Sequence, residues 1–309
     1  MTNNLTMGSL FAGVGGFDIA AKRARIDVVW SSENDKHASA VLAEHFPTVP
    51  NYGDIHDIKD APKVDILAGG FPCPSYSVAG NRGGLADDRG ALWWEFHRLI
   101  SEGQPTWVLG ENVPGLLSSS GGRDFTTIVK SLVQLGYGVV WRVLDAQWFG
   151  VAQRRKRVLI VGHSGGQPRP EVLALAESLC GHPAPSRPAG TVTSALTRNG
   201  VGGGGGPDDN AAQANHLIPS GAFRWKENRN HVQLDDPTTA LTVEQTQAVI
   251  TPQVRRLTPT ECERLQGFQD QWTATQSDTQ RYRQMGNAVA VPVAEWVMRR
   301  IAAAEKGDK

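Results

Sequence analysis

The first half of the chain alternates short apolar segments with segments of helical pattern, and this alternation is the strongest constraint on the fold. Six segments read as strands, namely 7–11, 28–31, 64–68, 106–110, 139–144 and 158–162. Helical patterns lie between them, at 19–24, 37–45, 91–100 and 125–135. Short apolar strands that alternate with helices are typical of an α/β protein with a parallel sheet. We therefore predict a doubly wound, mainly parallel sheet over residues 1–163.

The composition changes after residue 162. Residues 163–222 are rich in Gly, Pro, Ser, Thr and Asn, and they include the glycine tract 202–206. A section of this kind cannot build a large core of its own. It is either a flexible insertion or a small recognition lobe made of loops and short strands at 191–197, 215–218 and 239–250. We therefore divide the chain into a large domain, 1–163 with 255–309, and a smaller, loop-rich domain, 164–254.

Regular patterning returns near residue 256. Thr258 stands at a helix cap position, Pro259 follows it in the first turn, and Glu261 comes three residues after the cap. This spacing is the capping box, and it predicts a helix that ends at Gly267. A final apolar helix is predicted over 289–303.

The formal net charge of the 309 residues is zero, so any surface that binds nucleic acid must be local. Cationic clusters at 154–157, 224–229 and 255–256 are the candidates for such a surface. Cys73, Cys180 and Cys262 are far apart and belong to no CxxC pair or Cys/His cluster, so we expect neither a zinc site nor a disulfide framework. The beginning of the chain does not resemble a secretion signal, and no apolar run has membrane-spanning length. We expect a cytoplasmic protein.

The segment Phe71-Pro72-Cys73-Pro74 follows the third predicted strand and presents one thiol between two prolines. Proline fixes its own φ and restricts the residue before it, so the backbone around Cys73 is rigid. A thiol held rigidly at a strand end suits a nucleophile. Taken alone, the turn is more typical of a buried cysteine that packs as a small hydrophobic residue.

A glycine-rich turn, residues 11–17, follows the first predicted strand. Such a turn lets a ligand approach the following helix closely. Glu33 follows the second strand, where an acidic side chain commonly binds ribose hydroxyls, and Asp54 lies beyond another candidate strand. Together these features predict a nucleotide-type cofactor. The alternatives are a merely tight turn and, for each acid, a helix cap or a solvated charge.

Two further elements carry chemistry. Glu111 follows the strand 106–110, and a carboxylate in an apolar setting there can donate a proton near neutrality, unless it only caps the next turn. The basic run 153–157 leads into a core strand, so some of its arginines should point inward or along a cleft, unless the run is simply solvated. Carboxyl ends of strands line one crevice in doubly wound sheets. We therefore expect the glycine turn, Glu33, Cys73 and Glu111 to converge on one cleft.

The order of these motifs resembles that of the DNA (cytosine-5)-methyltransferases. The matching segments are FAGVGGFD at 11–18, SEN at 32–34, GDI at 53–55, GGFPCPSYSVAG at 69–80, GLADDRG at 84–90, GENVPG at 110–115, QRRKR at 153–157, RRLTPTECERLQGF at 255–268 and GNAVAVPVA at 286–294. The resemblance implies a Rossmann-like methyltransferase domain that binds S-adenosyl-methionine and a smaller target-recognition domain, with a DNA cleft between them. It also implies that the last helix returns to pack beside the first strand.

The resemblance assigns a cofactor pocket for S-adenosyl-methionine, with S-adenosyl-homocysteine as its product and no metal. Phe11 and the glycines after it would cradle the cofactor, Glu33 would hold the ribose, and Asp54 with Ile55 would meet the adenine. Asn34 stands where many relatives carry an aromatic residue that packs on the adenine. The implied pocket residues are Phe11, Ala12, Gly13, Gly15, Glu33, Asn34, Asp54, Ile55, Gly70, Pro72, Leu92, Asn287 and Val289.

The implied mechanism starts from a cytosine flipped out of the duplex, because its ring carbons are not accessible when stacked. The Cys73 thiolate attacks carbon 6, and Glu111 protonates or hydrogen-bonds ring nitrogen 3. Carbon 5 then takes the methyl group and loses its proton. Arg155 would orient Glu111 and the cytosine carbonyl together with Arg157. Contacts to DNA are expected from Ser75, Ser77, Arg89, Gln153 and Arg256.

The expected partner is double-stranded DNA. We expect the protein to be a monomer that does not associate with a membrane. A restriction-modification enzyme would have a cognate endonuclease, whereas a phage or orphan enzyme would not. An RNA cytosine methyltransferase of the same fold, an inactive DNA-binding module and a nicotinamide dehydrogenase are the alternatives. The long insertion favours DNA over RNA, and a dehydrogenase leaves the Pro-Cys turn and the basic run unexplained. The target sequence cannot be read, because base contacts depend on the geometry of the insertion.

Overall fold

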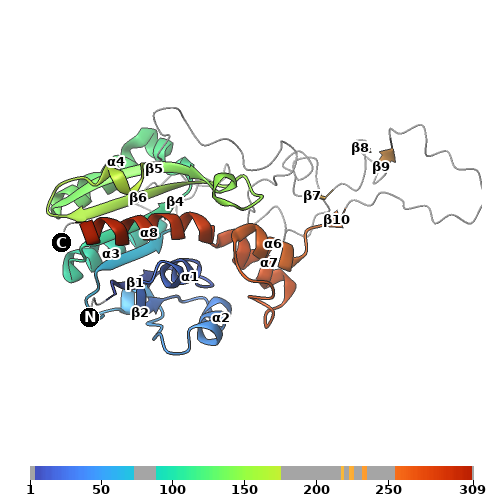
Figure 1. Cartoon of the computed structure of the whole chain (residues 1–309), viewed down its shortest axis with the longest axis horizontal. Helices are drawn as coiled ribbons and strands as arrows, with labels where there is room; N and C mark the ends of the chain where they lie inside the picture. Colours follow the sequence, from blue (N-terminus) through green and yellow to red (C-terminus); the bar gives the residue numbers. More distant parts are fainter. Residues whose placement is uncertain are drawn as a thin grey trace, which may run out of the picture.

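A computed structural model describes residues 4–72, 88–174, 217–218, 223–225, 232–234 and 255–307 (Figure 1). Cys73, Ser75 and Ser77 lie outside the described residues, as do the strands expected at 191–197 and 239–250. Arg89 and Arg256 belong to described backbone, but their side chains lie outside what the structure describes. Most of the smaller domain expected at 164–254 is likewise outside, so that division of the chain stays a prediction.

The main sheet has the order β2-β1-β3-β4-β6-β5. Its strands are β1 Thr6–Leu10, β2 Asp27–Ser32, β3 Ile66–Gly70, β4 Trp107–Asn112, β5 Tyr137–Asp145 and β6 Lys156–Ser164. β1 runs parallel to β2 and β3, and β3 runs parallel to β4, whereas β6 is antiparallel to both β4 and β5. The mainly parallel sheet predicted from the sequence is therefore confirmed, with β6 reversed.

Helices cover both faces of this sheet (Figure 1). The described helices are α1 Gly16–Arg23, α2 Lys36–His45, α3 Asp88–Gly103, α4 Arg123–Gln134, α6 Pro259–Gln266, α7 Asp278–Asn287 and α8 Val291–Gly307, of which α6 and α7 lie beside the sheet. Short 3-10 turns are η1 Ile55–Asp57, η3 Pro114–Gly122, η4 Ala146–Phe149 and η5 Pro170–Val172. Two small antiparallel pairs join β7 Leu217–Ile218 to β10 Arg255–Arg256 and β8 Phe223–Trp225 to β9 Val232–Leu234.

Two hydrophobic cores follow from the alternation of side chains along the strands. Ile66 and Ala68 of β3 face the core that α1 and α8 cover, whereas Leu67 faces the core that α3 and α4 cover. α8 packs directly against α1, so the end of the described chain returns to the first βα unit. The family resemblance implies that the last helix packs beside the first strand, whereas in the structure it packs on α1, the helix that follows that strand.

The C-terminal third contains two helices that were predicted from the sequence, α6 and α8, and one that was not, α7. α6 has the expected capping box, in which the Thr258 hydroxyl accepts from the Glu261 amide and the Glu261 carboxylate accepts from the Thr258 amide. α7 was missed because its sequence is polar and contains Gly286, which is unfavourable inside a helix. Within the described residues, none of the helices combines the length and the apolar character needed to cross a bilayer.

Candidate active site

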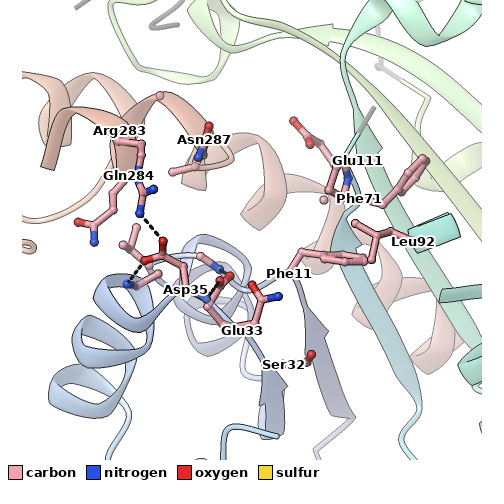
Figure 2. A pocket seen from close by; sticks show the side chains of 18 of the residues that line it. Phe11, Ser32, Glu33, Asp35, Phe71, Leu92, Glu111, Arg283, Gln284 and Asn287 are labelled. Carbon is pink, nitrogen blue, oxygen red and sulfur yellow. Dashed lines mark hydrogen bonds and ion pairs between the residues drawn. The ribbon is translucent and has the colours of Figure 1, made fainter. Parts of the chain in front are cut away.

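A cavity of about 610 Å³ opens at the edge of the sheet where β1 to β4 end (Figure 2). Its walls come from the glycine turn after β1, the ends of β2, β3 and β4, the start of β6 and the α7–α8 segment. The lining residues include Phe11, Gly13, Glu33, Asn34, Ile55, Gly70, Pro72, Leu92, Glu111, Arg155, Arg157 and Asn287. The structure therefore brings Glu33, Glu111 and the glycine turn together at one cavity. Cys73 follows Pro72 in the sequence, but its position is outside the described residues.

The glycine turn adopts left-handed backbone at several positions. Gly13 has φ 57° and Gly15, which caps α1, has φ 85°. Phe11 has φ 51° although it carries a side chain. A bulky residue in this region is strained, and such strain is concentrated at functional sites. The turn is thus shaped for close approach of a ligand at the amino end of α1.

The Glu33 carboxylate is held against the glycine turn. Its Oε2 accepts from the Gly13 amide at 2.7 Å, and its Oε1 accepts from the Asp35 amide at 2.8 Å. Burial raises the pKa of Glu33 above its ordinary value, although hydrogen bonds from these two amides act in the opposite direction. Each carboxylate oxygen can accept a second hydrogen bond, so Glu33 can still accept hydrogen bonds from the hydroxyl groups of a ligand.

Asn34 and Asp54 contact each other near the cavity mouth. Asn34 Nδ2 donates to Asp54 Oδ2 at 2.8 Å, while Asp54 Oδ1 accepts from the His56 amide at 3.0 Å. These hydrogen bonds, that of the His56 amide first, lower the pKa of Asp54 to about 2. Gly53 and Ile55, on either side of Asp54, line the cavity. In this chain Asn34 therefore orients an acidic neighbour, at the position where relatives are expected to carry an aromatic residue.

Glu111 and Arg157 form an ion pair at the edge of the cavity. Arg157 Nε lies 2.9 Å from Glu111 Oε1, and only 16% and 12% of the two side chains are exposed. Glu111 lies at the end of β4, and Arg157 at the start of the antiparallel neighbour β6. The pair can thus hold a proton-donating or proton-accepting carboxyl group in a fixed orientation.

Arg155 is turned toward the C-terminal segment. Its side chain is almost fully buried, and its Nη2 donates to the carbonyls of Gly286 at 3.1 Å and Ala288 at 2.8 Å. Burial, with the charge of Arg157 as a second cause, lowers the pKa of Arg155 to about 9. The expectation that a basic side chain of the run points inward is confirmed. The two arginines make different contacts, since Arg157 pairs with Glu111 and Arg155 binds the carbonyls on either side of Asn287, while the charge of Glu111 also acts on Arg155.

Three further predicted residues, Ala12, Val289 and Gln153, are buried and do not line the cavity. The Ala12 amide donates to the Ser32 carbonyl at 3.1 Å, which joins the turn to β2. Val289 is buried against Gly16, where an added Cβ would lie 2.7 Å from the valine Cγ1. Gln153, predicted to contact DNA, is fully buried and its Nε2 donates to the Leu265 carbonyl at 2.9 Å.

Several lining residues were not predicted. Asp35, Arg283 and Gln284 line the cavity, and Asp35 and Arg283 form an ion pair (Figure 2). The signal for Asp35 was its position before a helical run, where aspartate is a preferred cap. The signal for Arg283 was weaker, because it depends on recognising α7 as a helix.

Comparisons with known proteins agree with this geometry. A profile of the family of C-5 cytosine-specific DNA methylases matches residues 5–178 and 219–303. The Type II methyltransferase M.HpaII of Haemophilus parainfluenzae is 34% identical over 323 residues, which cover 96% of this chain and 88% of that protein. The Type II methyltransferase M.BanI of Aneurinibacillus aneurinilyticus is 43% identical over 166 residues, which cover 52% of this chain and 39% of that protein.

A solved structure supports the fold independently. The Dnmt2 methyltransferase of S. pombe superposes with a TM-score of 0.68 at 16% identity, over 99% of this chain and 100% of that one. At 16% identity this structural similarity supports the Rossmann-like fold and nothing more specific. The family match, which covers most of the chain, goes further and confirms the resemblance read from the motifs. The chain belongs to the family of C-5 cytosine-specific DNA methylases.

Proposed function

We propose that this chain transfers a methyl group from S-adenosyl-methionine to carbon 5 of a flipped cytosine in double-stranded DNA, through a covalent adduct with Cys73. One observation carries the proposal, because the Glu111–Arg157 pair and the glycine turn face the same cavity. A proton-handling carboxyl group and a nucleotide-type cradle therefore serve one site. The Type II relatives support a restriction-modification role with a cognate endonuclease as partner. A cytoplasmic location is part of the same proposal, because the substrate is DNA.

The residues present fit the proposed cofactor. Gly13 has left-handed backbone, and an added Cβ there would meet only the Phe11 carbonyl, at 4.0 Å, so the turn leaves open space. Glu33 would hold the ribose hydroxyls, and Phe11, Leu92 and Asn287 would close the walls. The cavity volume of about 610 Å³ is in the range of small-molecule sites. When bound, the cofactor supplies an electrophilic methyl group.

The residues around the cytosine have separate tasks. The Cys73 thiolate, having lost its proton, would form a bond to carbon 6, and the displaced electron pair would be taken up at nitrogen 3 with the help of Glu111. Carbon 5 would then take the methyl group and give up its proton to a base, and the carbon–sulfur bond would break. Arg157 would keep Glu111 oriented throughout. A cysteine is only a few per cent thiolate at pH 7, so nearby positive charge from Arg155 and Arg157 would help.

The DNA contacts remain part of this proposal. Residues 164–254 would form the target-recognition domain, and Ser75, Ser77, Arg89 and Arg256 would contact DNA, whereas Gln153 is buried and is no longer proposed as a DNA contact. In the structure the Gln153 side chain donates to the Leu265 carbonyl of α6, so Gln153 would hold the start of the basic run against α6.

Trapping with a duplex that contains 5-fluorocytosine tests the nucleophile. The intact protein should form a covalent complex that resists denaturation, and Cys73→Ala should form none while it still binds S-adenosyl-homocysteine. Cys262→Ala is the matched control, because Cys262 is buried in α6 and burial, followed by the charges of Glu261 and Glu263, raises its pKa to about 12. A complex that survives Cys73→Ala would refute the assignment. Methylation of a transfer RNA but not of duplex DNA would favour the RNA alternative.

Glu111→Gln tests the proton-handling role. The substitution retains a polar side chain but not the acid, so the methylation rate should fall by a factor of about 100 or more. DNA affinity should change much less, because the interaction lost is required in the reaction and not in binding. Single-turnover methylation and a DNA titration measure the two quantities. Equal losses in both would show that Glu111 serves binding alone.

A further inference from the structure

One wall of the cavity is formed by two segments that are far apart in the sequence. Asp35 stands at the start of α2, and Arg283 lies in α7, some 248 residues later. The two side chains form an ion pair, and both line the cavity (Figure 2). About a third of each side chain is exposed, so the pair is neither fully buried nor fully solvated.

Asp35 is fixed in place from the other side as well. Its Oδ1 caps α2 by accepting from the amides of His37 at 2.9 Å and Ala38 at 3.0 Å, while Oδ2 accepts from Arg283. Burial alone would raise the pKa of Asp35, but the Ala38 amide and the charge of Arg283 outweigh it and lower the pKa. The carboxylate is therefore an anion at neutral pH, and its position is set by the backbone of α2.

The ion pair lies in a longer seam between α2 and the segment before and within α7. His45 stacks on Trp272 with ring centroids 3.5 Å apart, and His37 Nδ1 lies 2.9 Å from Gln276 Oε1. Trp272 Nε1 also donates to the carbonyl of Val14, in the glycine turn, at 2.8 Å. The seam thus joins the glycine turn and α2 to the C-terminal segment. Asp35 and Arg283 form the part of the seam that lines the cavity.

We propose that Asp35 and Arg283 are a positioning pair that holds α7 against α2, so that the cofactor wall is in place before the ligand arrives. This inference rests on the proposed function, because it takes S-adenosyl-methionine and its product as the ligands. A wall that is already held loses less conformational freedom on binding. Without the pair, the ligand has to order α7 against α2 itself, so its affinity falls and it dissociates faster.

The competing explanation is that Arg283 binds the carboxylate of the cofactor directly. In that case Asp35 pairs with Arg283 only while the ligand is absent. The two explanations differ in the effect of Asp35→Asn. Asparagine also caps helices, so α2 retains its cap while the ion pair is lost. A positioning pair predicts weaker binding in this variant, whereas direct contact predicts binding that is unchanged or tighter, because Arg283 is then free for the ligand.

Titration of the full chain with S-adenosyl-homocysteine tests the proposal by calorimetry, without DNA. Arg283→Gln and Asp35→Asn should each weaken binding about two- to fivefold, the range of partly exposed ion pairs. The double variant should be no weaker than either single variant, because both remove the same interaction. Arg283→Lys should keep most of the affinity. Arg264→Gln is the matched control, since it breaks the exposed pair with Asp270 in the same C-terminal region but away from the cavity.

Salt gives a second measurement that a merely structural role would not move. Screening should weaken binding to the intact chain between low and high ionic strength and leave Arg283→Gln nearly unchanged. Unchanged affinity in both single variants, additive losses in the double variant, or wild-type binding by Asp35→Asn would each overturn the proposal. Failure of the intact chain to bind S-adenosyl-homocysteine would instead refute the proposed function.

Discussion

Gly13 and Gly15 offer a paired test of how the glycine turn works. Both have left-handed backbone, with φ 57° and 85°. Their surroundings differ. A Cβ on Gly15 would lie 2.7 Å from the ring of Phe46 and 3.3 Å from Leu42. A Cβ on Gly13 would find only the Phe11 carbonyl at 4.0 Å, and Gly13 lines the cavity. Alanine at Gly15 should therefore affect stability, and alanine at Gly13 should affect the ligand.

The magnitudes follow from these contacts. Left-handed backbone disfavours an alanine by about 1–2 kcal/mol, and this applies at both positions. Overlap with packed side chains adds about 1–3 kcal/mol at Gly15, because Phe46 must move. We expect Gly15→Ala to lower the free energy of unfolding by about 2–5 kcal/mol and Gly13→Ala by about 1–2 kcal/mol. For binding of S-adenosyl-homocysteine the order should reverse, with a loss of about tenfold or more in Gly13→Ala, equivalent to about 1.4 kcal/mol.

Two measurements check this reversal. Urea unfolding of the ligand-free variants, followed by circular dichroism, gives the free energies of unfolding. Calorimetric titration of the folded variants gives the affinities. If Gly13→Ala lowered the free energy of unfolding as much as Gly15→Ala, the overlap of the added methyl group with Phe46 would not be a significant cost, and the reasoning would be refuted. If Gly15→Ala lost more affinity than Gly13→Ala, the turn would not face the ligand as the cavity implies.

Two further predictions concern stability. Burial raises the pKa of Asp18 from 3.8 to about 6, so the folded protein binds this proton more tightly than the unfolded chain, and the stabilisation present below pH 4 should be lost as the pH rises from about 4 to about 6. Asp18→Asn should flatten that limb in urea unfolding at a series of pH values, and an unchanged limb would exclude Asp18 as its cause. Thr258→Ala should lower the free energy of unfolding by about 1 kcal/mol through loss of the α6 cap, whereas Thr258→Ser should retain it. Equal losses in the two would show that the hydroxyl is not what matters.

The fold could be predicted because each βα unit carries its own local signal. Apolar strands of the expected length precede the glycine turn and Glu111, and a capping box marks the start of α6. α7 could not be predicted in this way, since its sequence is polar and its burial depends on packing against α6. Arg283 was missed for the same reason, because a site residue cannot be placed on a helix that is not recognised.

The basic run shows how much a strand pattern can tell about a site. Side chains alternate between the two faces of an extended chain, and here Gln153 and Arg155 are buried whereas Arg154 and Lys156 are exposed. That alternation was available from the sequence once the run was placed before a core strand. What the sequence lacked was the partner of each arginine, which depends on whether α7 or β4 lies opposite.

The direction of β6 explains why the basic run reaches the cavity at all. In a purely parallel sheet, residues that precede a strand lie at the edge opposite to those that follow one. Glu33 and Glu111 follow β2 and β4, whereas Arg155 and Arg157 stand before or at the beginning of β6. Because β6 is antiparallel to β4, with Glu111 opposite Leu159, its first residues lie where β4 ends. In a parallel β6, Arg157 would lie at the opposite end of the strands from Glu111. The reversed direction of β6 therefore brings together the two charges of the proposed proton-handling pair.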